Sequence, residues 1–299
     1  MKIAFTSCFN FNQDKVQSTW NQISNYDPDY LFLLGDTIYM DYGITTIWQR
    51  LYSVKKFEKI MDRKYRKQFG CEAFQQLIKD MREKNGLYAT WDDHDFAWNN
   101  AKGESVGTQK TEVARKLFHK YLDCSTNRPH VYYSFDTPLA RVIFLDNRSE
   151  SSKHHLISEN QFNFLEKKLN HSLNYTIICG GLTLTEGGEN WEKYPKDFKR
   201  LTSLLQQKEN VFFIAGDIHK NAFIPPMEIN NNALKTPVQL ISSGLSINIF
   251  GWKQQHNWCS LELFGTSEPS VTFHNKNGID YPLTERSNKY LSKHFPIKS

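Results

Sequence analysis

Long hydrophobic runs are absent from this sequence of 299 residues. No uninterrupted apolar stretch approaches the roughly 18–20 residues that span a bilayer. The opening segment MKIAFTSCFNFNQD has too brief an apolar part, and no small-residue cleavage pattern, to be a signal peptide. We therefore expect a cytoplasmic protein with no transmembrane segment.

Paired cysteine motifs are also missing. The five cysteines are an odd number, lie far apart and form no Cys-x-x-Cys pair: Cys8, Cys71, Cys124, Cys179 and Cys259. This pattern argues against a disulfide framework and against a structural zinc knuckle. We expect most of these side chains to be buried thiols, with Cys8 as a separate case.

Charge of one sign is scarce as well, because 37 lysines and arginines face 32 acidic residues and leave a net charge of +5. One denser basic run, VKKFEKIMDRKYRK, covers residues 54–67. A solvated helix face explains this run more simply than nucleic-acid binding does. With 39% hydrophobic and 14% aromatic residues the chain can bury a full core, and we treat residues 1–299 as a single domain.

What the sequence does contain is an alternation of short β-rich runs with segments of helical period. One helix face is predicted from the i, i+3, i+4, i+7 spacing of Phe74, Leu77, Ile78 and Met81. Further helices are predicted at 108–122, at 195–207 with Pro195 in the first turn, and after a capping box of Ser158 and Gln161.

Strands are predicted from apolar runs rich in β-branched and aromatic residues, at 2–7, 30–34, 87–91, 131–135, 141–146, 175–179, 211–215, 238–242, 258–264 and 270–274. Their alternation with helices predicts an α/β protein with a mixed, largely buried sheet. From Pro237 onward the sequence shows strands alone, so we expect a second sheet there.

Side chains that bind metals follow five of the predicted strands. The segments are Cys8, Gly35-Asp36, Asp92-Asp93-His94-Asp95, Asp146-Asn147-Arg148 and Gly216-Asp217-Ile218-His219. Ligands bind outside the carboxyl ends of strands in open α/β sheets, so these segments can converge. Four or more acidic side chains in a water-poor crevice would repel one another strongly unless cations lay between them. The pattern therefore predicts a metal site.

Each of these residues alone has a plainer interpretation. An Asp after a strand is more often the N-cap of the next helix, a single His a loop residue, and a single Cys part of the core. N-caps do not explain the strings Gly-Asp-x-His and Asp-Asp-His-Asp, and five strand ends coincide. We therefore favour the metal site over these alternatives.

Six motifs follow one another between Cys8 and about Ser246: LLGDTIYMD (33–41), TWDDHDFAWNN (90–100), FLDNRSE (144–150), ENWEKYP (189–195), AGDIHKNAF (215–223) and ISSGLS (241–246). Together they resemble the alkaline phosphatase D (PhoD-like) branch of the calcineurin-like metallophosphoesterases. The resemblance implies a four-layer α/β/β/α sandwich of two mixed sheets flanked by helices, with metals at the strand ends. It also implies hydrolysis of phosphodiesters or phosphomonoesters by a metal-activated water.

The resemblance implies six metal ligands, which are Cys8, Asp36, Tyr39, Asp93, Asp217 and His219. Cys8 and Tyr39 would bind one metal, Asp36 would bridge two, and Asp93 would replace the Asn of the superfamily's Gly-Asn-His. Asp217 and His219 would complete the second side, at the position of the superfamily's Gly-His-x-His. A thiolate with a phenolate suits Fe³⁺, and a carboxylate-only side suits Ca²⁺ or Mn²⁺. Among two or more ions, Fe³⁺ and Ca²⁺ are therefore favoured, with Mn²⁺, Co²⁺ or Zn²⁺ as alternatives.

The sequence departs from the wider superfamily at two places. TSCFN (6–10) replaces the usual Asp-x-His after the first strand, which is typical of the alkaline phosphatase D branch. CGGLTLTEGG (179–188) has no histidine where the superfamily often supplies another ligand, so we expect the second metal to bind more weakly or to be Ca²⁺. The sequence shows neither the twin-arginine signal nor the extra N-terminal domain of secreted members, which favours the shorter, intracellular type.

Six further residues are predicted near the substrate or around the metal ligands. His94, among carboxylates that favour its protonated form, is expected to act as general acid or to bind the transition-state oxyanion. Arg148 either binds phosphate in bidentate fashion or forms a structural salt bridge to Asp146 or Glu150. Asn99 either bonds an oxygen at the metal or closes its loop. The three that are expected to position ligands, cap helices or line the substrate site are Asp92, Asp95 and Asp146.

Two rival functions stay open at this point. A two-metal nuclease gains some support from the basic run at 54–67, because phosphate backbones favour grooves lined with Lys and Arg. An inactive metal-binding domain that binds a partner is disfavoured, since His94 and Arg148 accompany the expected ligands. We favour a small-molecule phosphoester over nucleic acid as substrate, and make no prediction of the oligomeric state.

Overall fold

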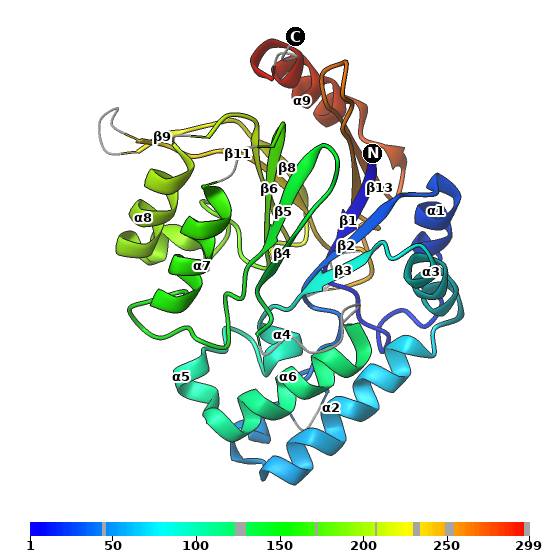
Figure 1. Ribbon diagram of the computed structural model, residues 1–299. Coiled ribbons are helices and arrows are strands. Elements are labelled where there is room, and N and C mark those ends of the chain that lie inside the picture. Colours follow the sequence, from blue (N-terminus) through cyan, green and yellow to red (C-terminus); the bar gives the residue numbers. More distant parts are fainter. Residues whose placement is uncertain are drawn as a thin grey trace.

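The computed structural model describes residues 1–43, 46–122, 130–170, 173–206, 208–229, 234–248 and 254–295. Two six-stranded sheets lie in the middle of the molecule, with helices on the outer side of each (Figure 1). These layers confirm the predicted α/β/β/α sandwich of two mixed sheets.

The first sheet has the order β14-β13-β12-β1-β2-β3. Its parallel strands are β1 (Lys2–Thr6), β2 (Tyr30–Leu34) and β3 (Leu87–Thr90), and its antiparallel strands are β12 (Trp258–Glu262), β13 (Ser270–Asn275) and β14 (Gly278–Ile279). One hydrophobic cluster joins this sheet to α1 (Thr19–Tyr26), α2 (Val54–Phe69), α3 (Glu72–Glu83) and α6 (Thr108–Leu122). Three short helices lie in the same half: η1 (Thr46–Leu51), α4 (Asp93–Phe96) and α5 (Gly103–Val106).

The second sheet has the order β4-β5-β6-β7-β11-β8. Its inner strands run parallel, namely β5 (Ala140–Phe144), β6 (Tyr175–Gly180), β7 (Val211–Ala215) and β11 (Val238–Ser242), while β4 (Tyr133–Asp136) and β8 (Asn221–Ile224) are antiparallel edges. Its outer face packs on α7 (Glu159–Leu169), η2 (Trp191–Lys193) and α8 (Pro195–Leu205). A separate two-stranded ribbon joins β9 (Glu228–Ile229) and β10 (Leu234–Lys235).

Both faces of the central strands are buried, which explains their continuous apolar sequence. Successive side chains of a strand point to opposite faces. In β1, Ile3 and Phe5 lie in the cluster between the two sheets, whereas Ala4 lies in the cluster under the helices. In β2, Phe32 and Leu33 divide in the same way. The sheets are therefore fixed to each other as well as to their helices, and this holds their strand ends in place.

All ten predicted strands are confirmed within a few residues at each end, and so are the helices predicted around 74–81, at 108–122, after Ser158 and at 195–207, which are α3, α6, α7 and α8. The expectation that the chain from Pro237 onward is strand only and forms its own sheet is wrong. There β11 completes the second sheet, β12 to β14 complete the first, and α9 (Tyr281–His294) follows. No clear helix signal is visible in the sequence there, because the buried positions of α9 are Ser287 and Leu291.

The remaining expectations concern the cysteines, the basic run and membranes. Four cysteines are buried free thiols, namely Cys8, Cys71, Cys179 and Cys259, whereas Cys124 lies outside the described residues. The basic run forms α2, which turns Phe57, Met61 and Tyr65 inward, as expected of a solvated helix face. Across the described ranges, no helix has both the length and the apolar character needed to cross a membrane.

Candidate active site

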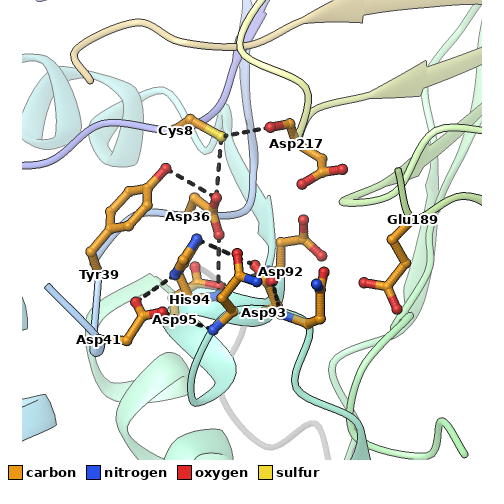
Figure 2. Close-up of polar contacts among 12 residues, drawn as sticks. Cys8, Asp36, Tyr39, Asp41, Asp92, Asp93, His94, Asp95, Glu189 and Asp217 are labelled. Carbon is orange, nitrogen blue, oxygen red and sulfur yellow. Dashed lines mark hydrogen bonds and ion pairs between the residues drawn. The ribbon is translucent and has the colours of Figure 1, made fainter. Parts of the chain in front are cut away.

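The carboxyl ends of parallel strands from both sheets meet at one place in the molecule. Cys8 follows β1, Asp36 follows β2, and Asp92 to Asp95 follow β3 in the first sheet. Asp217 follows β7 of the second sheet and faces them (Figure 2). Four of the five strand ends that were predicted to converge thus meet here, and the segment after the fifth, β5, contributes Arg148, which binds Asp92.

The backbone at this place has an unusual conformation. Cys8, Asp36, Asp217 and His219 have φ angles of 58°, 55°, 66° and 52°, in the left-handed region that side chains other than glycine rarely adopt. Each such residue costs of order 1–3 kcal/mol, and residues of this kind cluster at functional sites. All four are predicted metal ligands, so the strain lies where the side chains are turned toward a common centre.

Two glycines allow the strand ends to approach closely. A Cβ atom on Gly35, whose φ is +91°, would lie 2.5 Å from the Cβ of Asp92. A Cβ atom on Gly216 would lie 2.4 Å from Ser7 Oγ and 2.8 Å from the carbonyl oxygen of Leu34, which brings the ends of β7, β1 and β2 into contact. A larger residue at position 35 would push apart the ends of β2 and β3, and one at position 216 would push the two sheets apart at the site.

We call the group Cys8, Asp36, Tyr39 and His219 the thiol side. Cys8 Sγ and the Tyr39 hydroxyl both donate to Asp36 Oδ2, at 3.2 and 3.1 Å. The Tyr39 hydroxyl also lies 3.5 Å from His219 Nε2, so His219 lies beside Cys8 and Tyr39 and not, as expected, on the side of the second metal. Cys8, Asp36 and Tyr39 are at most 5% exposed.

Burial opposes ionisation on the thiol side. It raises the pKa of Cys8 to about 11 and the pKa values of Asp36 and Tyr39 well above their ordinary ranges. A carboxyl, a thiol and a phenol in direct contact cannot all ionise unless a cation lies among them. The donor set therefore fits a metal ion that binds thiolate and phenolate.

Asp36 also belongs to a second group of possible ligands. Cys8, Asp36 and His219 each offer a ligand atom within 4.8 Å of the others, and Asp36, Asp93 and His94 do the same. Asp93 Oδ1 is buried and has no hydrogen-bond partner among the described residues, so it has a free lone pair for a cation. Although burial opposes it, His94 and Arg148 lower the pKa of Asp93 and keep it ionised. Asp36 is therefore placed to serve two ions.

Asp41 orients His94. Its Oδ1 lies 2.5 Å from His94 Nδ1, and its Oδ2 accepts the backbone N–H of Asn99 at 2.8 Å. Burial lowers the pKa of His94, but Asp93, Asp36 and Asp41 together raise it well above its ordinary value. Nδ1 is thus occupied, and Nε2, 4.0 Å from Asp93 Oδ1, is the nitrogen that remains available.

We call the group Asp92, Arg148 and Glu189 the arginine side. Arg148 is 1% exposed; its Nε donates to Asp92 Oδ1 at 2.5 Å and its Nη1 to Glu189 Oε2 at 2.7 Å. The salt-bridge alternative for Arg148 is therefore present, but with partners other than the predicted Asp146 and Glu150. Nη2, without a hydrogen-bond partner among the described residues, is the part of the guanidinium left for another group.

The carboxylates of Asp146 and Asp95 accept hydrogen bonds from nearby N–H groups, mostly of the backbone, and do not face the proposed metal ligands. Asp146 Oδ1 accepts the indole N–H of Trp91 at 2.7 Å and the backbone N–H of Arg148 at 3.0 Å. The Gln161 side chain bonds the Asp146 backbone instead of completing the predicted capping box of α7. Asp95 accepts the backbone N–H groups of Asp92 and Thr37, and so fixes the turn at α4.

The sequence analysis missed three residues that contact the site. These are Asp41, Glu189 and Ser243, whose Oγ donates to Cys8 Sγ at 3.1 Å and accepts the backbone N–H of His219 at 3.0 Å. All three lie within the six motifs described above. Membership in a motif was therefore the feature of the sequence that pointed to them. Asn99 is exposed and closes its loop through its backbone N–H. Asp217, at the rim, belongs to neither group of possible ligands within the described residues, although burial raises its pKa to about 7.

Comparisons with known proteins agree with the fold and identify the family. A solved structure of PhoD is 16% identical, with a TM-score of 0.63, over 93% of this chain and 70% of that chain. A purple acid phosphatase from yellow lupin (Lupinus luteus) seeds is 14% identical, with a TM-score of 0.57, over 93% of this chain and 52% of that chain, so this chain spans about half its length. No curated protein matches the sequence. The PhoD-like phosphatase family matches residues 3–287, and the chain therefore belongs to this family of phosphoric ester hydrolases.

Proposed function

We propose that the chain is a metal-dependent phosphoesterase in which two cations share Asp36. The observation that carries the proposal is that Asp36 belongs to both groups of possible ligands, one with Cys8 and His219 and one that includes Asp93. The site also contains more buried carboxyl groups than cationic side chains. These carboxyls must either bind added cations or take up protons, because burying unpaired negative charges is costly.

The donors divide between the two ions by their chemistry. Cys8, Tyr39 and His219 offer sulfur, phenol oxygen and nitrogen, which suit Fe³⁺ or another transition ion. Asp93 and Asp217 offer carboxylate oxygens, which suit Ca²⁺ or Mn²⁺. Metal ions bound there would supply a nucleophilic water at neutral pH and screen the charge on the phosphoryl oxygens.

His94 holds the proton for the leaving group in this proposal. Asp41 binds Nδ1, fixes the ring and favours the imidazolium form, so that Nε2 presents an N–H. Cations near Asp36 and Asp93 would weaken the field of those two carboxylates, whereas Asp41 would keep its effect. The Tyr39 ring, 4.3 Å from the His94 ring, limits its motion.

Arg148 is proposed to position the site. Its two ion pairs hold Asp92, which follows β3 and precedes Asp93, and Glu189, which lies in the loop before η2. The contact with Asp92 joins segments from the two sheets, and the contact with Glu189 joins two loops of the second sheet. Asp92 thereby fixes the start of α4, on which Asp93 and His94 lie.

The experiment is hydrolysis of p-nitrophenyl phosphate and bis-p-nitrophenyl phosphate by metal-stripped protein. Fe³⁺, Ca²⁺, Mn²⁺, Co²⁺ or Zn²⁺ is added back singly and in pairs. We expect particular ions to restore nitrophenol release, and the ratio of the two activities to rank monoester against diester. Asp93→Asn should abolish the restored activity, while the exposed Glu285→Gln in α9 serves as the matched control.

Failure of every ion and ion pair, with metal binding intact, would reject the phosphoesterase and favour a metal-binding domain without turnover. Cleavage of single-stranded DNA in preference to both nitrophenyl esters, with a steep dependence on salt, would instead favour the nuclease.

A further inference from the structure

A cavity of about 570 Å³ lies beside the candidate active site. Its walls are formed by Asn100, Lys102, Lys153, Gly188, Glu189, Lys193, Tyr194 and Asp217. Asp217 is one of the proposed metal ligands, and the backbone N–H of Asn100 donates to Asp93. The cavity therefore begins where the proposed phosphoryl site ends.

Three lysines reach this cavity from three separate segments. Lys102 is the N-cap of α5, Lys153 lies between β5 and α7, and Lys193 ends η2. The ammonium of Lys102 lies 5.1 Å from the centre of the Tyr194 ring, which holds it at the wall. In the part of the chain that the structure describes, none of the three forms an ion pair within 4.0 Å. Their positive charge is thus available to a ligand.

The acidic groups on the cavity wall do not cancel this charge. Glu189 is already paired with Arg148, at 2.7 Å. Asp217 faces the proposed metal site, where cations would offset its charge. With both carboxylates accounted for, the wall presents three cations next to the place where a phosphoester would be cleaved.

A phosphate ester with a neutral leaving group would have no use for these lysines, since the metal site itself attracts the scissile phosphate. Lysines on a surface commonly extend into water, yet here three of them from separate segments line a single cavity. Like charges close together repel one another, and a bound anion relieves that repulsion. The arrangement therefore favours a ligand with negative charge at a second place.

We propose that this cavity binds a second anionic group of the substrate, a phosphate or a carboxylate, in addition to the phosphoester that is cleaved. The inference rests on the proposed function, because the metal site anchors the first phosphate. It predicts that the preferred substrates carry at least two anionic groups, while simple nitrophenyl esters are still hydrolysed at the metal site.

Binding of non-hydrolysable probes tests the inference without turnover. Calorimetry on the metal-reconstituted protein would compare propane-1,3-bisphosphonate with propylphosphonate, and homologues with two- and four-carbon spacers. We expect at least one bisphosphonate to bind about 10-fold tighter than its matched monophosphonate at low salt, because three lysines each add a modest attraction. The ratio should fall at high salt, since exposed charges are screened.

Two triple variants separate the lysines from the metals, which could also bind a second phosphonate. The cavity variant combines Lys102→Gln, Lys153→Gln and Lys193→Gln. In this variant the affinity ratio of bisphosphonate to monophosphonate should fall to the value that the bound metals produce without the lysines. The control combines Lys276→Gln, Lys289→Gln and Lys293→Gln, which remove the same charge from exposed positions at the α9 end of the molecule (Figure 1). This control should keep the wild-type ratio.

A ratio that is the same in wild type and in the cavity variant overturns the inference, whether or not the protein hydrolyses esters. Nitrophenyl ester hydrolysis on the same samples tests the proposed function separately. Turnover with a lysine-independent ratio rejects the second anion site alone. A lysine-dependent ratio without turnover supports the second anion site and rejects the phosphoesterase.

Discussion

The thiol side and the arginine side of the candidate active site neutralise their acidic groups by different means. On the arginine side, Asp92 and Glu189 both bind the buried guanidinium of Arg148. On the thiol side, Asp36 receives hydrogen bonds from the uncharged groups of Cys8 and Tyr39. The arginine side thus contains a cation that the protein itself supplies, although one guanidinium faces two carboxylates, whereas the thiol side needs an added cation.

This difference separates the residues that build the site from those that react. A buried ion pair contributes by fixing geometry, and breaking it leaves an unpaired charge. A buried carboxyl among neutral donors destabilises the metal-free protein and is retained for what it binds. Changes on the two sides should therefore affect different measurements, stability on the arginine side and metal-dependent activity on the thiol side.

The largest effect is expected from Asp36→Asn. The substitution keeps the shape of the side chain but removes the shared negative charge, so the proposed site loses its hold on both ions. We expect hydrolysis of bis-p-nitrophenyl phosphate to fall by at least about 10⁴-fold. Metal content, measured by mass spectrometry, should fall together with it. An active variant with full metal content would show that Asp36 is not shared between ions.

His94→Ala is expected to act on turnover without removing metal. We expect kcat to fall by about 10²–10⁴-fold, because the proton donor to the leaving group is lost. A substrate with a leaving group that needs no proton should be affected much less than an alkyl ester. Loss of metal along with activity would instead place His94 among the metal ligands. In that case Asp41→Asn, which removes the carboxylate that holds the His94 ring, should also lower the metal content.

Arg148→Met is expected to act mainly on stability. It leaves Asp92 buried without its partner, and we expect the free energy of unfolding to fall by about 3–5 kcal/mol in urea titrations. Adding Asp92→Asn to Arg148→Met should recover part of this loss, since the unpaired charge is then gone. Equal stability of Arg148→Met and wild type would mean that the ion pairs do not hold the arginine side together.

The smallest effect is expected from the pH dependence of the metal-free protein. Burial raises the folded pKa of Asp217 to about 7, whereas an unfolded Asp titrates near 3.9. Between these values the folded form holds a proton that the unfolded form releases, so stability rises as pH falls from about 8 to about 5. Asp217→Asn should reduce this rise by on the order of 1–2 kcal/mol, and Glu285→Gln should not. A metal-free wild type that loses stability over this range would contradict the charge assignment of the site.

The sequence was informative where a signal is local. Apolar β-rich runs located the ten central strands, and the residues after them located the site. The contacts of Arg148 with Asp92 and Glu189 join residues 56 and 41 positions apart, and no local pattern specifies them. Asp41 was overlooked because nothing in LLGDTIYMD shows that this carboxylate turns toward His94. The terminal helix α9 was missed because it buries few apolar side chains.

The left-handed backbone at Cys8, Asp36, Asp217 and His219 has a consequence for how this sequence would change under selection. Glycine adopts that conformation without strain, so replacing any of the four would relax the chain while removing a proposed ligand. A population selected only for heat resistance, in medium with a chelator, should therefore accumulate glycine at these positions. Selection for growth on a phosphoester should remove the same substitutions. The residues found at these four positions would therefore show whether a lineage was selected for stability or for hydrolysis.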